Sequence, residues 1–123
     1  MGISFKYIEN DTILVRKMTG KLKFETLYSS WLDLIMNRSI KPGIIGVVND
    51  IRDAELLMEV ADLKKLIELF EEHIDIFGKT KMAVLVSSYK NIVFPMMGDK
   101  LTSKLNIKPF STFDAAVGWI KTK

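Results

Sequence analysis

The side chains of this chain that are best suited to chemistry follow two short apolar segments, residues 44–48 and 82–86. Carboxylates and a guanidinium come after the first segment, and three hydroxyls come after the second: Asp50, Arg52, Asp53, Ser87, Ser88 and Tyr89. In open α/β sheets, ligands bind outside the carboxyl ends of the strands. If both segments are parallel strands, these side chains meet at one end of the sheet and form a ligand- or partner-binding site over an apolar floor.

A structural role is the alternative for the first group of residues. Asp50 and Asp53 would then cap the helix that follows, since aspartate accepts the free N–H groups of a helix start. Arg52 would form an ion pair with one of them. Under both hypotheses we expect the chain to have left its strand by Asp50 and to form a loop as far as Glu55.

Signals for catalysis and for metal binding are sparse in this sequence. The single histidine, His73, follows Glu72 in an acidic segment, and we interpret it as a solvated helix-face residue rather than a general base. The chain has no cysteine, no phosphate-binding glycine loop, no Gly-x-Ser-x-Gly elbow and no Asp-x-Asp-x-Asp loop. We therefore expect a non-enzymatic protein without a cofactor or a bound metal.

The two apolar segments predict the fold class. Each is uncharged and rich in β-branched residues and does not alternate with polar residues, which indicates parallel strands that are covered on both faces. Between them, residues 60–77 have helical periodicity, and Gly78 is a natural residue to end that helix. Strand, helix and strand form a βαβ unit.

The preceding fifty residues predict a hairpin and a helix. Residues 3–8 and 12–18 have apolar side chains at alternate positions, which predicts two strands joined by a turn at 9–11. Gly20 is expected to end the second strand. An apolar stripe then predicts an amphipathic helix formed on Phe24, Leu27, Tyr28, Trp31, Leu34 and Ile35.

The last third of the chain predicts a helix, a strand and a final helix. The first of these helices runs through Met97 to about residue 105. Either it starts near Pro95, or an earlier helical turn begins at Asn91 and is kinked at the proline. A strand over 106–110 contains a proline and therefore belongs at a sheet edge, and Ser111 is expected to cap the final helix. The order ββαβαβαβα predicts an α/β fold: a mixed, mostly parallel five-stranded sheet with helices on both faces, the first strand antiparallel.

Residues 92–98 place large apolar side chains in a loop or first helical turn: Phe94, Met96 and Met97. Methionine suits irregular gaps and adaptable surfaces. Three hypotheses remain open for this segment, namely a cap on the core, a homodimer contact, and the mouth of an apolar pocket.

Composition narrows the class of protein. The length of 123 residues predicts a single domain. The net charge is +3, but residues 51–77 are acidic and residues 78–123 are basic. The basic part holds scattered lysines without arginine, so we expect no nucleic-acid binding.

No apolar run approaches the roughly 18 residues that a membrane span needs. No signal peptide is evident at the start, and we expect a cytoplasmic protein.

Several segments carry a resemblance to a known family. They are the end of the hairpin at 18–22 (MTGKL), the strand running into 48–55, the strand 81–86, and the closing segment 110–120, which is similar to the family's final Phe…Ala-x-x-Trp-Leu. Over nearly its whole length the chain resembles the SpoIIAA-like family of small bacterial domains. These domains are related in fold to STAS domains and to the lipid-binding Sec14 (CRAL-TRIO) domains.

The resemblance implies a binding or regulatory domain with a protein partner and without general catalytic activity. The alternative, by analogy with the lipid-binding relatives, is a carrier or sensor of an apolar small molecule. STAS anti-sigma-factor antagonists carry a phosphorylatable serine at the start of the helix after the Asp-containing strand. The matching residues 50–55 contain neither serine nor threonine, so control by phosphorylation is not expected at this place.

Overall fold

The computed structural model describes residues 2–87 and 89–122, with all their side chains except those of residues 89, 90, 92, 93, 97 and 99. In chain order the elements are β1 (Gly2–Ile8), β2 (Ile13–Lys23), α1 (Phe24–Met36), β3 (Gly46–Leu57), α2 (Val60–Glu72), α3 (Ile74–Phe77), β4 (Lys81–Leu85), α4 (Tyr89–Leu101), β5 (Asn106–Phe110) and α5 (Phe113–Ile120).

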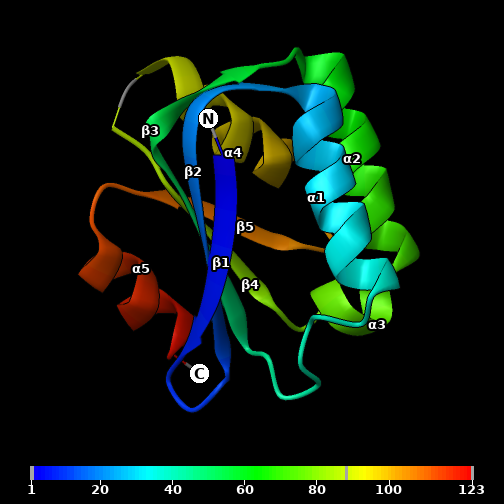
Figure 1. Ribbon diagram of the computed structural model, residues 1–123, viewed down its shortest axis with the longest axis vertical. Helices are drawn as coiled ribbons and strands as arrows, with labels where there is room; N and C mark the ends of the chain where they lie inside the picture. The colour runs from blue at the N-terminus through cyan, green and yellow to red at the C-terminus, as the bar shows by residue number, and fades with distance from the viewer. Residues whose placement is uncertain (1, 88, 123) are drawn as a thin grey trace.

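The five strands form one sheet in the order β1-β2-β3-β4-β5. β1 is antiparallel to β2, and the other neighbours are parallel, as the sequence predicted. Helices lie on both faces: α1 and α2 pack side by side on one face and α5 lies on the other (Figure 1). β5 is an edge strand, which confirms the position inferred from Pro109, because proline cannot donate a hydrogen bond to a further strand.

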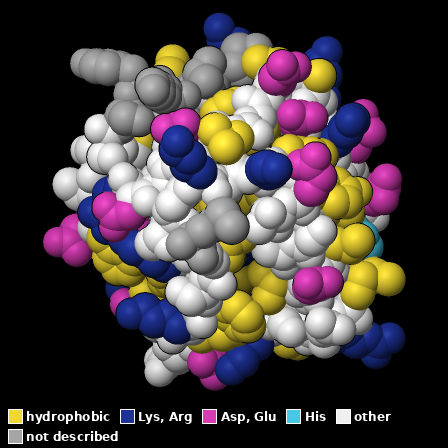
Figure 2. Space-filling model, turned by 45° about the horizontal axis from the view of Figure 1, so that its top comes forward, with side chains coloured by type: hydrophobic (Ala, Val, Ile, Leu, Met, Phe, Trp, Pro, Cys, Tyr) yellow, Lys and Arg dark blue, Asp and Glu magenta, His cyan; other side chains and the backbone are white. Residues whose placement is uncertain are grey.

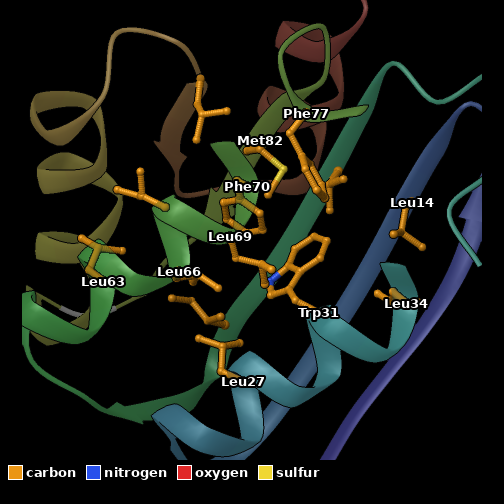
Figure 3. Close-up of a cluster of buried hydrophobic side chains, with 14 of the residues drawn as sticks. Leu14, Leu27, Trp31, Leu34, Leu63, Leu66, Leu69, Phe70, Phe77 and Met82 are labelled. Atoms are coloured by element: carbon orange, nitrogen blue, oxygen red, sulfur yellow. The ribbon is translucent and has the colours of Figure 1, made fainter. Parts of the chain in front are cut away.

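The larger core lies between the sheet and the helices α1, α2 and α4. At its centre the Trp31 ring meets Phe70 and Phe77 edge-on, with ring centroids 5.0 and 5.7 Å apart (Figure 3). A smaller core under α5 is formed by Ile13, Val15, Val48, Ala83, Leu85, Ala116 and Ile120. Gly46 allows α5 to approach β3, since a Cβ at that position would overlap the Ile120 side chain.

β2 and β3 are longer than predicted. β2 continues through Gly20, which adopts a φ of 80°, and ends at Lys23, while β3 continues to Leu57. Each extension pairs with the other in a parallel ladder beyond the last residue of β4. The prediction that residues 50–55 form a loop is therefore wrong, because the paired strand satisfies the backbone although four of these six side chains are charged.

Two features of the central helical segment differ from the prediction. The predicted single helix over 60–77 is interrupted at His73, which ends α2 and precedes the short α3. The cap of α2 is Glu59, whose side chain forms a capping box with Asp62. The alternative that Asp50 and Asp53 cap this helix is therefore wrong, since both lie within β3.

The boundaries of the last two helices also differ. α4 begins before Pro95 and ends at Leu101, so the earlier start is correct and the expected end near residue 105 is too late. The N-cap of α5 is Thr112, whose Oγ1 accepts a hydrogen bond of 3.2 Å from the backbone N–H of Ala115. Ser111 is exposed and does not occupy the cap position predicted for it.

Candidate functional site

A cluster of four charged side chains lies where β2 and β3 run beyond β4. We call it the strand-end cluster and define it as Lys17, Asp50, Arg52 and Asp53. In the ladder Lys17 is the partner of Asp50, and the next pair is Thr19 with Asp53, so β3 contains one extra residue. Such a bulge leaves a residue unpaired and redirects the side chains that follow it. Because of this bulge, Asp50 and Asp53 reach the same lysine.

Asp50 is the centre of the cluster. Both of its oxygens accept hydrogen bonds from Arg52, from Nε and from Nη2, each at 2.9 Å. The Lys17 ammonium lies 3.3 Å from Asp50 Oδ2 and 2.7 Å from Asp53 Oδ2. The bidentate arginine–carboxylate geometry is among the strongest that charged side chains form in proteins. Four side chains are therefore held in one arrangement.

The side chains of the strand-end cluster differ in burial: Asp50 is buried and holds the others in place, and the others are exposed to solvent to differing degrees. The Asp50 side chain is only 7% exposed, whereas that of Asp53 is 66% exposed, and Lys17 and Arg52 are partly exposed. Burial by itself would raise the pKa of the Asp50 carboxyl. Hydrogen bonds from Arg52 and Lys17 outweigh that effect, and the pKa of Asp50 is lowered from its usual value. Asp50 is therefore a carboxylate at neutral pH.

The pKa values of Lys17 and Arg52, the partners of Asp50, are also shifted. Hydrogen bonding to Asp53 is the largest influence that raises the pKa of Lys17, and hydrogen bonding to Asp50 is the largest that raises the pKa of Arg52. Both cations are therefore held more firmly in their charged forms. A general acid or base needs a pKa near the working pH, so this arrangement suits charge recognition rather than proton transfer.

Ser87, which follows β4, lies beside this cluster, as its position at the strand end suggested. Ser87 Oγ donates a hydrogen bond of 2.8 Å to the backbone carbonyl of Arg52. Ser88 lies outside the described residues. Tyr89 is the first residue of α4, and its side chain is likewise outside the description. Of the three predicted hydroxyls, Ser87 is the one that the structure brings to the cluster.

The sequence interpretation missed the role of Asn91. This buried residue of α4 donates from Nδ2 to the carbonyl of Ala54 at 2.8 Å and accepts at Oδ1 from the N–H of Leu56 at 3.4 Å. Its amide thus replaces a neighbouring strand along the part of β3 that extends past β4. An asparagine directly before the apolar run 92–97 was the available signal, because a buried amide requires partners.

A groove next to the strand-end cluster adds apolar surface to it. Its lining includes Lys17 and Asp50 together with Val15 and Phe113. Figure 2 tilts the top of Figure 1 forward and shows charged side chains of both signs spread among hydrophobic ones. At the level where β4 ends, β2 and β3 thus combine fixed charges with an apolar wall.

The apolar segment in α4 divides between two places. Phe94 is half-buried, packs on the larger core and lines a partly open cavity of about 80 Å³ together with Pro95. Met96 is 52% exposed and lines a separate groove that also contains Lys108 and Trp119. The side chain of Met97 is outside the description. Phe94 and Met96 therefore do not share one site.

The described part of the chain shows neither a metal-binding cluster nor a membrane-spanning helix. Within residues 2–87 and 89–122, no group of three or more acidic or histidine side chains is placed to hold a metal ion. None of the helices described in this range combines the length and the apolar character that crossing a membrane requires.

No protein-family model and no curated protein matches the chain. Among solved structures, an uncharacterised DUF3478-family protein with a SpoIIAA-like fold from Shewanella loihica PV-4 is similar, with a TM-score of 0.62 and 18% identity over 97% of this chain and 92% of that one. An anti-sigma factor antagonist from Mycobacterium paratuberculosis has a TM-score of 0.62 and 16% identity over 98% and 96%. The chain thus has a SpoIIAA-like fold, and the resemblance inferred from its sequence is confirmed at the level of the fold.

Proposed function

We propose that this protein is a non-enzymatic regulatory domain that binds a protein partner through the strand-end cluster. The observation that carries the proposal is the anchoring of exposed charges by buried Asp50, with Arg52 held at 2.9 Å and Lys17 shared between two carboxylates. One similar structure is that of an anti-sigma factor antagonist, which supports a role in protein binding.

The physical advantage of this arrangement is preorganisation. Ordering a flexible side chain at an interface costs about 0.5–1.5 kcal/mol. Arg52 and Lys17 are already ordered by Asp50, so a partner meets them without that cost. Charges placed in this way favour the correct partner and speed its encounter. Val15 and Phe113 in the adjacent groove offer the apolar contact that charges alone do not supply.

The means of control differs from phosphorylation at the start of α2. Residues 50–60 contain no serine, threonine or tyrosine, and the first residues of α2 are capped by Glu59. We therefore expect the partner's own state, or competition for the strand-end cluster, to control binding. A modified residue found within 50–60 in protein from its native cells would contradict this expectation.

The test compares two double variants with equal changes in charge. Arg52→Ala with Asp53→Asn removes one positive and one negative charge from the strand-end cluster. Lys64→Ala with Glu68→Gln does the same on the exposed face of α2. Wild-type protein and both variants are immobilised, and proteins captured from the native cells are quantified by mass spectrometry.

We expect a defined protein to be captured by the wild type and by the α2 variant, and its recovery to fall at least about tenfold with the cluster variant. Truncating hydrogen-bonded charges at interfaces costs 2 kcal/mol or more, which corresponds to such a factor. Equal capture by all three proteins would place the partner elsewhere on the surface. Absence of any specific capture by the wild type would refute the protein-binding role.

The cavity lined by Phe94 favours a second candidate, a carrier or sensor of a small apolar molecule. Its lining of α1, α2, α4 and sheet residues is almost wholly apolar, and Asn49 is the polar residue among the lining side chains. Its volume of about 80 Å³ exceeds the roughly 10–15 Å³ that one water needs, and apolar cavities remain dry and accept apolar guests. A molecule the size of a lipid would require α4 to move.

Native mass spectrometry tests this second candidate directly. We expect protein purified from its native cells to carry a bound apolar molecule that is released on denaturation. Filling the cavity by Leu63→Phe should abolish this added mass, while Val60→Phe on the exposed start of α2 should retain it. The mass of the bare chain in all three samples would exclude the carrier role.

A further inference from the structure

Arg16 is a buried cation that the strand-end cluster does not use. It lies in the first half of β2, is fully buried, and stacks its guanidinium 3.9 Å above the centre of the Trp31 ring. Nη1 donates to Asn49 Oδ1 at 3.3 Å, and Nη2 donates to Ser30 Oγ. Nε is buried and has no hydrogen-bond partner among the described residues.

Within the part of the chain that the structure describes, no carboxylate forms an ion pair with Arg16. Among the described side chains, the groups that bind its guanidinium are a hydroxyl, an amide and an indole ring, all neutral. Burial lowers the pKa of Arg16 to about 9, and it therefore remains protonated at neutral pH. Buried charges in proteins are ordinarily paired because removing them from water is costly. Arg16 departs from that rule.

A cleft of about 220 Å³ between β1 and α1 has Arg16 in its lining. We call it the Arg16 cleft. Phe5 stands directly opposite Arg16 in the β1–β2 ladder and is 51% exposed, and Leu34 of α1 adds to the apolar wall. The Asn37 amide lies in the same lining and supplies a further donor. The cleft thus combines an unbalanced cation, an aromatic wall and a neutral donor.

We propose that the Arg16 cleft binds an oxyanion carried on a small apolar body, with Arg16 holding the anion. Carboxylate and phosphate share the chemistry that a guanidinium recognises. The Nε–H, which has no partner among the described residues, is the donor that such a group would satisfy. Because Arg16 is fully buried, the exposed Phe5 side chain opposite it would move aside to admit the anion, and Phe5 and Leu34 would then enclose its apolar body. An apolar cavity of about 150 Å³ accepts benzene, so a cleft of about 220 Å³ has room for an aromatic carboxylate.

Two other residues of the cleft have distinct roles in this proposal. Ser30 is a positioning residue, because its hydroxyl accepts from Arg16 and donates to the Leu27 carbonyl at 2.9 Å, which leaves no proton for a ligand. Asp33 is an exposed carboxylate in the lining, and its negative charge weakens anion binding. Removing that charge should strengthen the site.

The experiment follows the Arg16 Nε–H by ¹H–¹⁵N NMR during titrations of the full chain. The probes are benzoate, phenyl phosphate and neutral benzamide, at constant ionic strength set with chloride. The Nε–H signal is assigned by its loss in Arg16→Met, a change that folded proteins tolerate because replacing a buried charge by an apolar side chain is often neutral. Arg52→Met is the matched control at the strand-end cluster.

We expect a saturable shift of the Arg16 Nε–H with benzoate or phenyl phosphate and none with benzamide, and the stronger of the two anions identifies the class of ligand. Asp33→Asn should bind about two- to fivefold tighter, which is the range of one exposed charge interaction. Arg52→Met should leave the affinity unchanged, which separates this site from the proposed partner surface.

Three results would overturn the proposal. One is an equal response to benzamide, which would show apolar contact alone. Another is a response that follows chloride concentration, which would show ionic strength alone. The third is an affinity unchanged in Asp33→Asn, and this comparison holds even if Arg16→Met does not fold.

Discussion

Lys17 and Asp53 form an ion pair of 2.7 Å although the residue directly opposite Lys17 in the ladder is Asp50. The extra residue in β3 between Asp50 and Asp53 makes this possible, since a regular strand would place Asp53 on the opposite face. A single backbone irregularity therefore collects two carboxylates around one ammonium, and the surface proposed to bind a partner depends on it.

The anchoring role of Asp50 predicts a pH-dependent loss of stability in Asp50→Asn. At pH 7 the variant should lose about 1–3 kcal/mol of unfolding free energy, because hydrogen bonds to charged groups are replaced. The pKa of Asp50 is lowered in the folded state. Its contribution is therefore complete above the unfolded pKa of about 3.9 and is lost as the pH falls through the lower folded pKa.

Urea denaturation of wild type and variant from pH 7 to pH 2.5 measures this difference. The gap between the two proteins should narrow below about pH 4. Asp53→Asn is the control, since this exposed partner of Lys17 should change stability by less than about 1 kcal/mol. A gap that widened on acidification would contradict the assignment of Asp50 as a stabilising carboxylate.

Leu85→Ala should strongly destabilise the fold. Leu85 is fully buried under α5 and belongs to the smaller core, so truncation removes transfer energy and leaves a cavity, at a cost of about 2–5 kcal/mol. Chemical denaturation gives the value. Leu57→Ala, at an exposed position at the end of β3, should cost much less. Similar losses in both variants would remove Leu85 from the core.

Substitutions at the start of α5 distinguish two neighbouring hydroxyls. Thr112→Ala should cost about 0.5–2 kcal/mol because the N–H of Ala115 loses its acceptor, and Thr112→Gly should cost less. Ser111→Ala should change the unfolding free energy by no more than about 0.5 kcal/mol, as exposed positions usually do. Thermal denaturation of the three variants ranks them, and the reverse order would restore Ser111 as the cap.

Asn91→Ala should cost about 1–3 kcal/mol of unfolding free energy, since it leaves the carbonyl of Ala54 and the N–H of Leu56 without their partner. Hydrogen exchange at Leu56 provides a local readout, and we expect faster exchange there than at Val48. Asn106→Ala, at an exposed position of β5, is the matched control. Unchanged exchange at Leu56 would show that Asn91 does not support β3.

The two apolar residues of α4 should respond differently to a charge. Phe94→Asp puts a carboxylate against the larger core and should lower the melting temperature markedly. Met96→Asp, at a half-exposed position, should leave the fold stable. Analytical ultracentrifugation of Met96→Asp then tests the homodimer hypothesis: a shift to monomer relative to the wild type supports a contact at Met96, and an unchanged distribution excludes it.

Local patterns in the sequence were sufficient to predict the order of the main helices and strands and the direction of each strand. The uncharged run 44–48 and the helical stripe after Val60 depend on residues near one another in the chain, and so do the turn at 9–11 and the proline of β5. Each of these signals reports which side of an element is buried. Right-handed crossover then leaves few arrangements of such a chain.

The candidate site depended on tertiary contacts between residues distant in the chain. Residues 19–23 contain a glycine and two lysines, and residues 53–57 contain two carboxylates, so neither segment resembles a buried strand. They become strands because each supplies the other's backbone partners across more than thirty residues. Asn91 and Ala54, which are joined by a hydrogen bond, are likewise 37 residues apart in the chain. Arg16 and Lys17 are adjacent cations in β2, and only the approach of Trp31 on α1 determines that the charge of Arg16 is buried rather than solvated.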